Sequence, residues 1–154
     1  MMRRSPRVFL DTSVVFAAVL SPGGGARRLF HLAEAGLLTL IVGPNVLREC
    51  DEVVRRKAPS SLPGLAQLLA AGRVQTCPPP SDKQVADARS YVEYKPDAHV
   101  LAEAISAGAD WLVTHDKAHF LKVSAETQLP FKIGTPGDLI RSVVDNHLAV
   151  YGNR

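Results

Sequence analysis

Four acidic residues occupy positions from which they could act together in one reaction, namely Asp11, Glu49, Asp97 and Asp116. Two of them each follow a short apolar run that is expected to form a strand, and the other two fall in the first turns of segments with helical periodicity. In open parallel α/β folds the strands end, and the following helices begin, at one edge of the sheet. The sequence therefore predicts that all four carboxylates lie at that edge.

Carboxylates gathered in this way need a counter-charge. Several of them within a few ångströms repel one another, and their pKa values rise unless cations neutralise them. Hard divalent ions with oxygen ligands, Mg²⁺ or Mn²⁺, suit such a cluster. An ion of this kind can lower the pKa of a bound water and clamp a phosphodiester during in-line attack. The four acids thus point toward metal-dependent hydrolysis.

The stretch from Lys95 to Phe120 predicts a helix, a tight turn and a strand, with an acid at each end. Pro96 suits a first helical turn, where a missing N–H costs nothing. Gly108 stands where a helix commonly stops in a left-handed cap. Trp111–Thr114 is a short apolar run typical of a strand buried on both faces. Residues at helical spacing form one face of this helix: Asp97, Val100, Leu101, Ala104 and Ile105.

In the rest of the chain, short apolar runs typical of strands alternate with segments whose apolar residues recur at helical spacing. Strands are expected at Val8–Leu10, Leu38–Val42, Val74–Cys77 and Phe131–Ile133. Helices are expected from Thr12 to Val19, at Ala26–Ala35, Asn45–Lys57, Leu65–Ala71 and Asp82–Tyr91, and from Pro136 onward, with Ala58–Gly64 as a loop. Alternating strands and helices predict an α/β fold, a parallel sheet covered on both faces. Residues 1–154 read as a single domain.

Composition sets looser bounds on function. The chain has 154 residues, 46% of them hydrophobic, and a formal net charge of +3, which permits a polyanionic partner without requiring one. Cys50 and Cys77 form no metal-binding or redox motif, which favours a reducing, cytoplasmic setting. Arg3 and Arg4 precede an apolar run that Asp11 interrupts, so neither a signal peptide nor a membrane segment is expected.

Four motifs in order resemble the PIN-domain nucleases, especially the stand-alone microbial members related to VapC-type toxins. They are Asp11-Thr12-Ser13-Val14, Glu49 in Pro-x-x-Leu-x-Glu, Asp97 in Asp-x-x-Val-Leu-x-x-Ala, and Ala109-Asp110-x-Leu-Val-Thr-x-Asp116-x-x-x-Phe. The resemblance runs from Arg7 to about Leu139. It implies a three-layer PIN-like fold with a central parallel sheet of four to five strands.

The resemblance also implies an activity. The matching proteins are metal-dependent ribonucleases, in which a metal-activated water hydrolyses the phosphodiester. Asp11, Glu49, Asp97 and Asp116 match the catalytic and metal-binding acids, while Ser13 and Thr114 match small hydroxyl positions that support them. Several members carry a further acid one to three residues after the last of these acids. Here those places hold Lys117, Ala118 and His119, which leaves open whether one metal ion or two would bind.

Partners follow from the same resemblance. Toxin-like relatives usually act as homodimers restrained by an antitoxin, so RNA, a cognate antitoxin and a second copy are the expected partners. Apolar residues that could form a dimer surface are Leu65, Leu68, Val15 and Val19. Basic residues that could hold RNA phosphates are Arg27, Arg28, Arg55 to Lys57, and Lys117.

Other interpretations stay open at this point. Taken singly, Asp11 could be a helix cap, Glu49 a solvated residue and Asp97 a helix-dipole partner. A PIN-like chain could also be a catalytically silent module that binds RNA or a partner protein. A phosphatase of the haloacid-dehalogenase type phosphorylates an Asp after its first strand, but it needs a second acid two residues later, where this chain has Ser13.

Overall fold

The structure is a computed structural model, and it describes residues 4–92, 95–116, 120 and 129–151. Some expected positions lie outside the described residues. They are Lys117, which is expected to contact RNA, and the three places for a further acid, Lys117, Ala118 and His119. Within the described part, no helix is long and apolar enough to cross a membrane.

The described strands form one five-stranded sheet in the order β3-β2-β1-β4-β5, and every pairing is parallel. Their bounds are Arg7–Leu10 for β1, Thr39–Val42 for β2, Gln75–Thr76 for β3, Trp111–Val113 for β4 and Lys132–Gly134 for β5. The predicted parallel α/β sheet is confirmed. Strand β3 is shorter than expected, since Pro78, Pro79 and Pro80 follow it closely and proline cannot donate to a sheet ladder.

Strand order fixes where a site can form. Successive strands β1, β2 and β3 step outward in one direction, whereas β4 and β5 lie on the other side of β1. Phe9 at the centre of β1 pairs with Ile41 of β2 and with Leu112 of β4. The order therefore reverses between β1 and β4, and the crevice beyond the carboxyl ends of these two strands is the usual ligand site of such folds.

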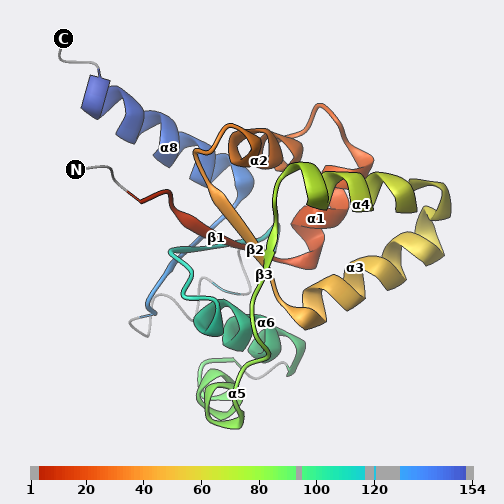
Figure 1. The fold of residues 1–154 in the computed structure, drawn as a ribbon. Helices are drawn as coiled ribbons and strands as arrows, with labels where there is room; N and C mark the ends of the chain where they lie inside the picture. Colours follow the sequence, from red (N-terminus) through yellow and green to blue (C-terminus); the bar gives the residue numbers. More distant parts are fainter. Residues whose placement is uncertain (1–3, 93–94, 117–119, 121–128, 152–154) are drawn as a thin grey trace.

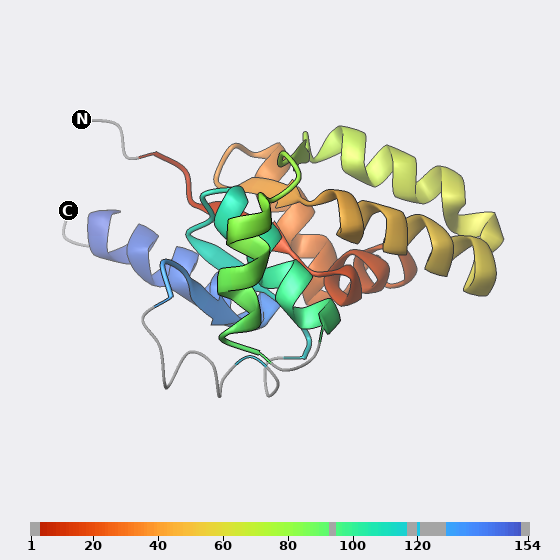
Figure 2. The ribbon, with the colours of Figure 1, turned by 90° about the horizontal axis from the view of Figure 1, so that it is seen from below.

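Helices cover the sheet on both sides (Figure 1). Helices α1, α2 and α4 lie on one side, while α5 and α6 pack together on the other. Helix α3 contacts both α1 and α6, and it runs beside α4 away from the sheet (Figure 2). The helices are α1 (Thr12–Leu20), α2 (Gly25–Glu34), α3 (Pro44–Lys57), α4 (Leu62–Ala71), α5 (Asp82–Arg89), α6 (Lys95–Ser106) and α8 (Pro136–Tyr151).

The segment between α3 and α4 differs from the sequence expectation. The sequence predicts a loop at Ala58–Gly64, but Pro59–Ser61 form a 3-10 helix and α4 already begins at Leu62. Pro59 and Pro63 both fall in first helical turns, where the missing N–H has no helical partner to lose. The prolines and Gly64 that suggest a loop therefore start helices instead.

The core lies between the sheet and its two helical layers. Its largest fully buried apolar side chains are Phe9, Phe30, Phe120, Leu10, Leu29, Leu40, Ile41, Leu101, Leu112 and Leu139. The core also contains residues that the sequence assigns to a dimer surface. Leu65 is 5% exposed, Leu68 9% and Val15 1%, and the half-buried Val19 packs against the same core. That assignment was wrong for Leu65, Leu68 and Val15, because these three side chains are covered by their own chain.

Helix α6 ends as the sequence predicts. Gly108 follows it with φ of +61°, and its N–H donates to the Ile105 carbonyl at 3.0 Å. This left-handed conformation disfavours any residue with a Cβ. Gly64 differs, since it lies inside α4 and an added Cβ would meet no atom within 4 Å.

The same substitution should therefore have opposite effects at these two glycines. Gly108→Ala should lower the free energy of unfolding by about 1–2 kcal/mol because of left-handed strain. Gly64→Ala should raise it by about 0.5–1 kcal/mol, since alanine loses less backbone entropy in a helix. Urea unfolding of both variants measures the difference. Equal effects at the two positions would contradict the assigned end of α6.

Candidate active site

Asp11 is held in place by both elements that meet at the strand-order reversal. It follows β1, and its backbone N–H donates to the Val113 carbonyl of β4 at 3.0 Å. Its Oδ1 accepts a hydrogen bond from the Thr12 N–H at 2.8 Å, so Asp11 caps helix α1. Its Oδ2 accepts from Thr114 Oγ1 at 2.8 Å and from Ser13 Oγ at 3.3 Å. The carboxylate therefore acts as a helix cap and is also tied to β4.

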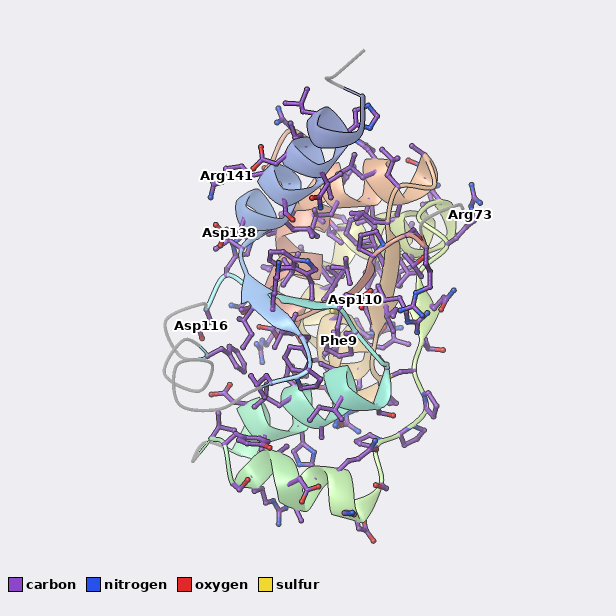
Figure 3. All side chains as sticks on the ribbon, turned by 90° about the vertical axis from the view of Figure 1, so that its left-hand side faces the viewer. Phe9, Arg73, Asp110, Asp116, Asp138 and Arg141 are labelled. Carbon is purple, nitrogen blue, oxygen red and sulfur yellow. The ribbon has the colours of Figure 1, made fainter. Side chains whose placement is uncertain are left out.

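Thr114 links this carboxylate to the segment after β4. Its side chain is fully buried, and Oγ1 both donates to Asp11 and accepts from the Asp116 N–H at 2.9 Å. The N–H of the exposed His115 donates to Ser13 Oγ at 3.2 Å. Figure 3 shows Asp116 beyond the end of β4, on the same side of the molecule as Asp138. The two hydroxyls thus fix the backbone that carries Asp116.

Glu49 joins the same network from helix α3. This half-buried residue accepts a hydrogen bond through Oε2 from Thr12 Oγ1 at 2.7 Å. The neighbouring Cys50 is sensitive to both acids. Burial raises the pKa of Cys50 to about 12, and the negative charges of Glu49 and Asp11 contribute to that rise, against a hydrogen bond with Thr12 that lowers it. Thr12, which the sequence analysis does not single out as a site residue, therefore bridges two of the predicted acids.

Asp97 lies on α6, the helix on the other side of the sheet from α1. It is half-buried in the first turn of α6, where the positive end of the helix dipole favours a carboxylate. Helix α6 packs against α3, the helix that carries Glu49. Both acid-bearing helices begin at the edge where β1 and β4 end.

The chemistry of these donors suits Mg²⁺ or Mn²⁺, because the four predicted groups are all carboxylates. The described side chains do not, however, contain a group of three or more His, Cys, Asp or Glu side chains placed to hold a metal ion. Hydrogen bonds link Asp11 to Thr12 and Thr114, and through them to Glu49 and the backbone of Asp116. Convergence of all four carboxylates around an ion stays a prediction.

One buried acid does not emerge from the sequence analysis. Glu103 on α6 is 0% exposed, and burial raises its pKa, while the Asn45 and Val46 N–H groups act in the opposite direction. Its neighbours Ala102 and Ala104 are fully buried as well. Helical periodicity does not predict this burial, because Glu103 shares a face of α6 with His99 and Ser106.

The basic residues that the sequence assigns to phosphate contacts are only partly placed as expected. Arg27 donates through Nε to the Ala18 carbonyl at 2.6 Å and through Nη2 to the Val19 carbonyl at 3.3 Å, so it closes the end of α1. The assignment of Arg27 to phosphate binding is therefore not supported. Arg55 pairs with Asp51 at 2.8 Å, whereas Arg56 and Lys57 are exposed.

Asp110 has a structural role, as the sequence context at the start of a strand suggests. Its Oδ2 accepts a hydrogen bond from the Arg7 N–H at 2.8 Å. Its backbone N–H donates to the Arg7 carbonyl at 2.7 Å. These contacts hold the start of β1 beside the start of β4, at the edge of the sheet opposite to the acids.

A pocket of about 670 Å³ lies away from the four acids, between α3 and α4. Its lining is mainly apolar, with charged residues of α3 among the lining side chains. The residues are Pro44, Leu47, Arg48, Asp51, Arg55, Leu62, Leu65, Ala66 and Leu69. None of the predicted site acids lines it.

Comparison with known proteins agrees with this architecture. The family model described as PIN domain matches residues 7–118, more than half of the chain. The chain therefore belongs to the PIN domain family, a family of nucleases. No curated protein matches it by sequence.

Solved structures show the same fold at low sequence identity. PAE2754 from Pyrobaculum aerophilum is 17% identical, with a TM-score of 0.58 over 91% of this chain and 92% of that one. FitAcB from Neisseria gonorrhoeae is 19% identical, with a TM-score of 0.56 over 84% of this chain and 97% of that one. FitAB bound to an IR36 DNA fragment gives the same identity and TM-score over 84% and 94%.

The hydroxyl of Thr114 should matter for stability as well as for the site. Thr114→Val keeps the volume but leaves Asp11 Oδ2 and the Asp116 N–H without this partner, so the free energy of unfolding should fall by about 1–3 kcal/mol. Thr76→Val, on the exposed strand β3, is the matched control and should change it by less than about 0.5 kcal/mol. Urea unfolding of the two variants makes the comparison. Equal stability of Thr114→Val and the wild type would contradict the network.

Both cysteines should be unreactive in the native protein. Burial raises the pKa of Cys50 to about 12 and that of Cys77 to about 11. At pH 8 the thiolate fraction is then roughly one in 10,000 and one in 1,000, against roughly one in four for a free thiol. Ellman's reagent should label them slowly at pH 8, faster as the pH rises, and at once in denaturant. Rapid native labelling at pH 8 would show that the site edge is open to solvent at Cys50.

Proposed function

We propose that this chain is a divalent-metal-dependent endoribonuclease that hydrolyses phosphodiester bonds in RNA. The observation that carries the proposal is the hydrogen-bonded set of Asp11, Thr12, Glu49 and Thr114 at the reversal of strand order. Acids held at this place in a PIN-domain chain are suited to the phosphodiester chemistry of that family.

The roles proposed for the residues rest on the resemblance to PIN-domain nucleases and on the hydrogen bonds at the site. Asp11, Glu49, Asp97 and Asp116 would hold Mg²⁺ or Mn²⁺ through carboxylate oxygens. The ion supplies Lewis-acid polarisation of the phosphate and lowers the pKa of a water molecule when bound. Ser13 and Thr114 orient Asp11 through its Oδ2, and Thr12 orients Glu49 through its Oε2. Supporting contacts of this kind fix the direction of ligands and tune their affinity.

RNA is the proposed substrate, and binding would use backbone charge more than base identity. The exposed cations Arg28, Arg56 and Lys57 are candidates for phosphate contacts, so affinity should fall as salt rises. DNA is the competing nucleic acid, since one similar structure is FitAB bound to a DNA fragment. A cleavage assay should therefore include both.

Regulation is proposed from the resemblance to VapC-type toxins. On that basis the chain is the toxin of a toxin–antitoxin pair, with a cognate antitoxin as partner, a homodimer as the working form and the cytoplasm as its location. Leu65, Leu68 and Val15 cannot supply the dimer surface, because they are buried within their own chain.

Two alternative functions, a phosphatase and a catalytically silent binding module, differ in how well the observations support them. A phosphatase of the haloacid-dehalogenase type is not supported, because the chain belongs to the PIN domain family and Ser13 hydrogen-bonds Asp11 where that chemistry needs an acid. A catalytically silent module that binds RNA or a partner protein is favoured by one observation. The described side chains contain no group of three or more potential ligands placed to hold a metal ion.

Glu49 and Glu52 on the same helix give a matched test. Glu49 accepts a hydrogen bond from Thr12, whereas Glu52 lies on the same helix without any role in the proposed site. Changes in residues that merely support metal ligands cost about 10–100-fold, so Glu49→Gln should slow Mn²⁺-dependent cleavage of labelled RNA at least about 100-fold. Glu52→Gln should cleave like the wild type.

The same assay separates the alternatives. Wild-type protein that retains RNA in a binding assay but cleaves neither RNA nor DNA with Mg²⁺ or Mn²⁺ would identify a silent module. Cleavage that continues in excess chelator would reject metal dependence. Preferential cleavage of DNA would correct the substrate while leaving the nuclease chemistry in place.

A further inference from the structure

Burying the carboxyl group of Glu103 costs free energy, and the proposed nuclease chemistry does not explain why this acid is buried. Its side chain is fully buried on α6, and Oε2 has no hydrogen-bond partner among the described residues. Burying a carboxyl group while one of its oxygens has no hydrogen-bond partner is expensive, since that oxygen loses its water without a replacement. A residue retained at such a cost needs a specific role, and its contacts indicate which one.

The contacts of Glu103 are with the start of helix α3. That helix has no cap of its own, because Gly43 at the N-cap position has no side chain and Pro44 has no N–H. The first N–H available belongs to Asn45, and it donates to Glu103 Oε1 at 2.8 Å. The N-terminal cap of α3 is therefore supplied by a different helix, fifty-eight residues along the chain.

Steric fit holds this contact in one geometry. A Cβ added at Gly43 would lie 1.5 Å from Glu103 Oε2 and 2.2 Å from its Cδ. No side chain larger than a hydrogen atom can stand there unless Glu103 or the helix start moves. The backbone of α3 is thus packed directly onto the carboxyl group of α6, with no flexible side chain between them.

The two helices joined in this way carry two of the proposed metal ligands. Glu49 follows Asn45 by about one turn of α3, and Asp97 lies in the first turn of α6. A shift of one helix along the other would change the separation of these two acids. Metal sites depend on supporting residues that fix their ligands to within a fraction of an ångström.

We propose that Glu103 is a positioning residue that locks the start of α3 onto α6 and so sets the separation of Glu49 and Asp97 for metal binding. This inference rests on the proposed function, since it assumes that both acids bind the ion. Glu103 itself touches neither substrate nor metal. It acts through its length and shape, which place an acceptor oxygen at the Asn45 N–H.

Two variants separate position from charge. Glu103→Gln keeps the length and an acceptor oxygen but removes the charge, whereas Glu103→Asp keeps the charge and is one methylene shorter. Mn²⁺ affinity of the full chain is measured by isothermal titration calorimetry, next to urea unfolding. Glu103→Gln should bind Mn²⁺ within about threefold of the wild type, and Glu103→Asp about 10–100-fold more weakly.

Further variants control for stability and folding. Val54→Ala removes a fully buried side chain near the other end of α3, so it should lower stability and leave Mn²⁺ affinity unchanged. Gly43→Ala leaves the carboxyl group intact but displaces it, so it should weaken Mn²⁺ binding as Glu103→Asp does. It replaces Glu103→Asp if that variant does not fold.

The outcomes also separate this inference from the proposed function. Wild-type affinity in Glu103→Asp would overturn the inference, because a shortened side chain would then leave the ligands in place. A loss in Glu103→Gln as large as that in Glu103→Asp would overturn it too, since glutamine keeps the length and the acceptor oxygen through which Glu103 is proposed to act. If the wild type binds no Mn²⁺, or Asp97→Asn binds it equally well, the metal site itself is refuted.

Discussion

The hydrogen bond from Thr114 Oγ1 to Asp11 Oδ2, 2.8 Å long, is the contact on which the candidate site depends. It joins the end of β1 to the end of β4, the two strands between which the order of the sheet reverses. Because Thr114 is fully buried and also accepts the Asp116 N–H, one hydroxyl orients one acid and the backbone of another. The parallel sheet places the ends of β1 and β4 side by side, and this hydrogen bond fixes the direction of the Asp11 carboxylate relative to β4.

Helix α3 shows a different way of building a site from remote parts of the chain. Its N-terminus lacks a capping side chain, and Glu103 of α6 supplies the acceptor instead. The arrangement leaves one buried carboxyl oxygen without a hydrogen bond among the described residues. The unpaired oxygen costs free energy, while the hydrogen bond to Asn45 holds the start of α3 against α6. Functional sites commonly depart from local rules in this way.

Much of this architecture could be predicted, because hydrophobic periodicity, proline and glycine mark the elements directly. The β1 and β4 strands, the left-handed Gly108 and the helix that carries Asp97 all follow from local signals. The predictions were wrong where one local pattern is compatible with two structures. Proline near Leu62 began a helix instead of a loop, and the apolar face of α4 covered its own core instead of a partner. The sequence could not show which surface α4 faces, because that depends on the helices around it.

By itself the sequence determined the α/β class, the PIN-domain motifs and the placement of Asp11 and Asp116 after strands. Periodicity of side chains along the chain carries this information, so no knowledge of packing is needed. Only the tertiary structure decided that Thr12 bridges Asp11 to Glu49, that Arg27 closes α1, and that Glu103 caps α3. Each of these is a hydrogen bond whose distance and direction are set by how whole helices and strands pack, which local sequence patterns do not encode.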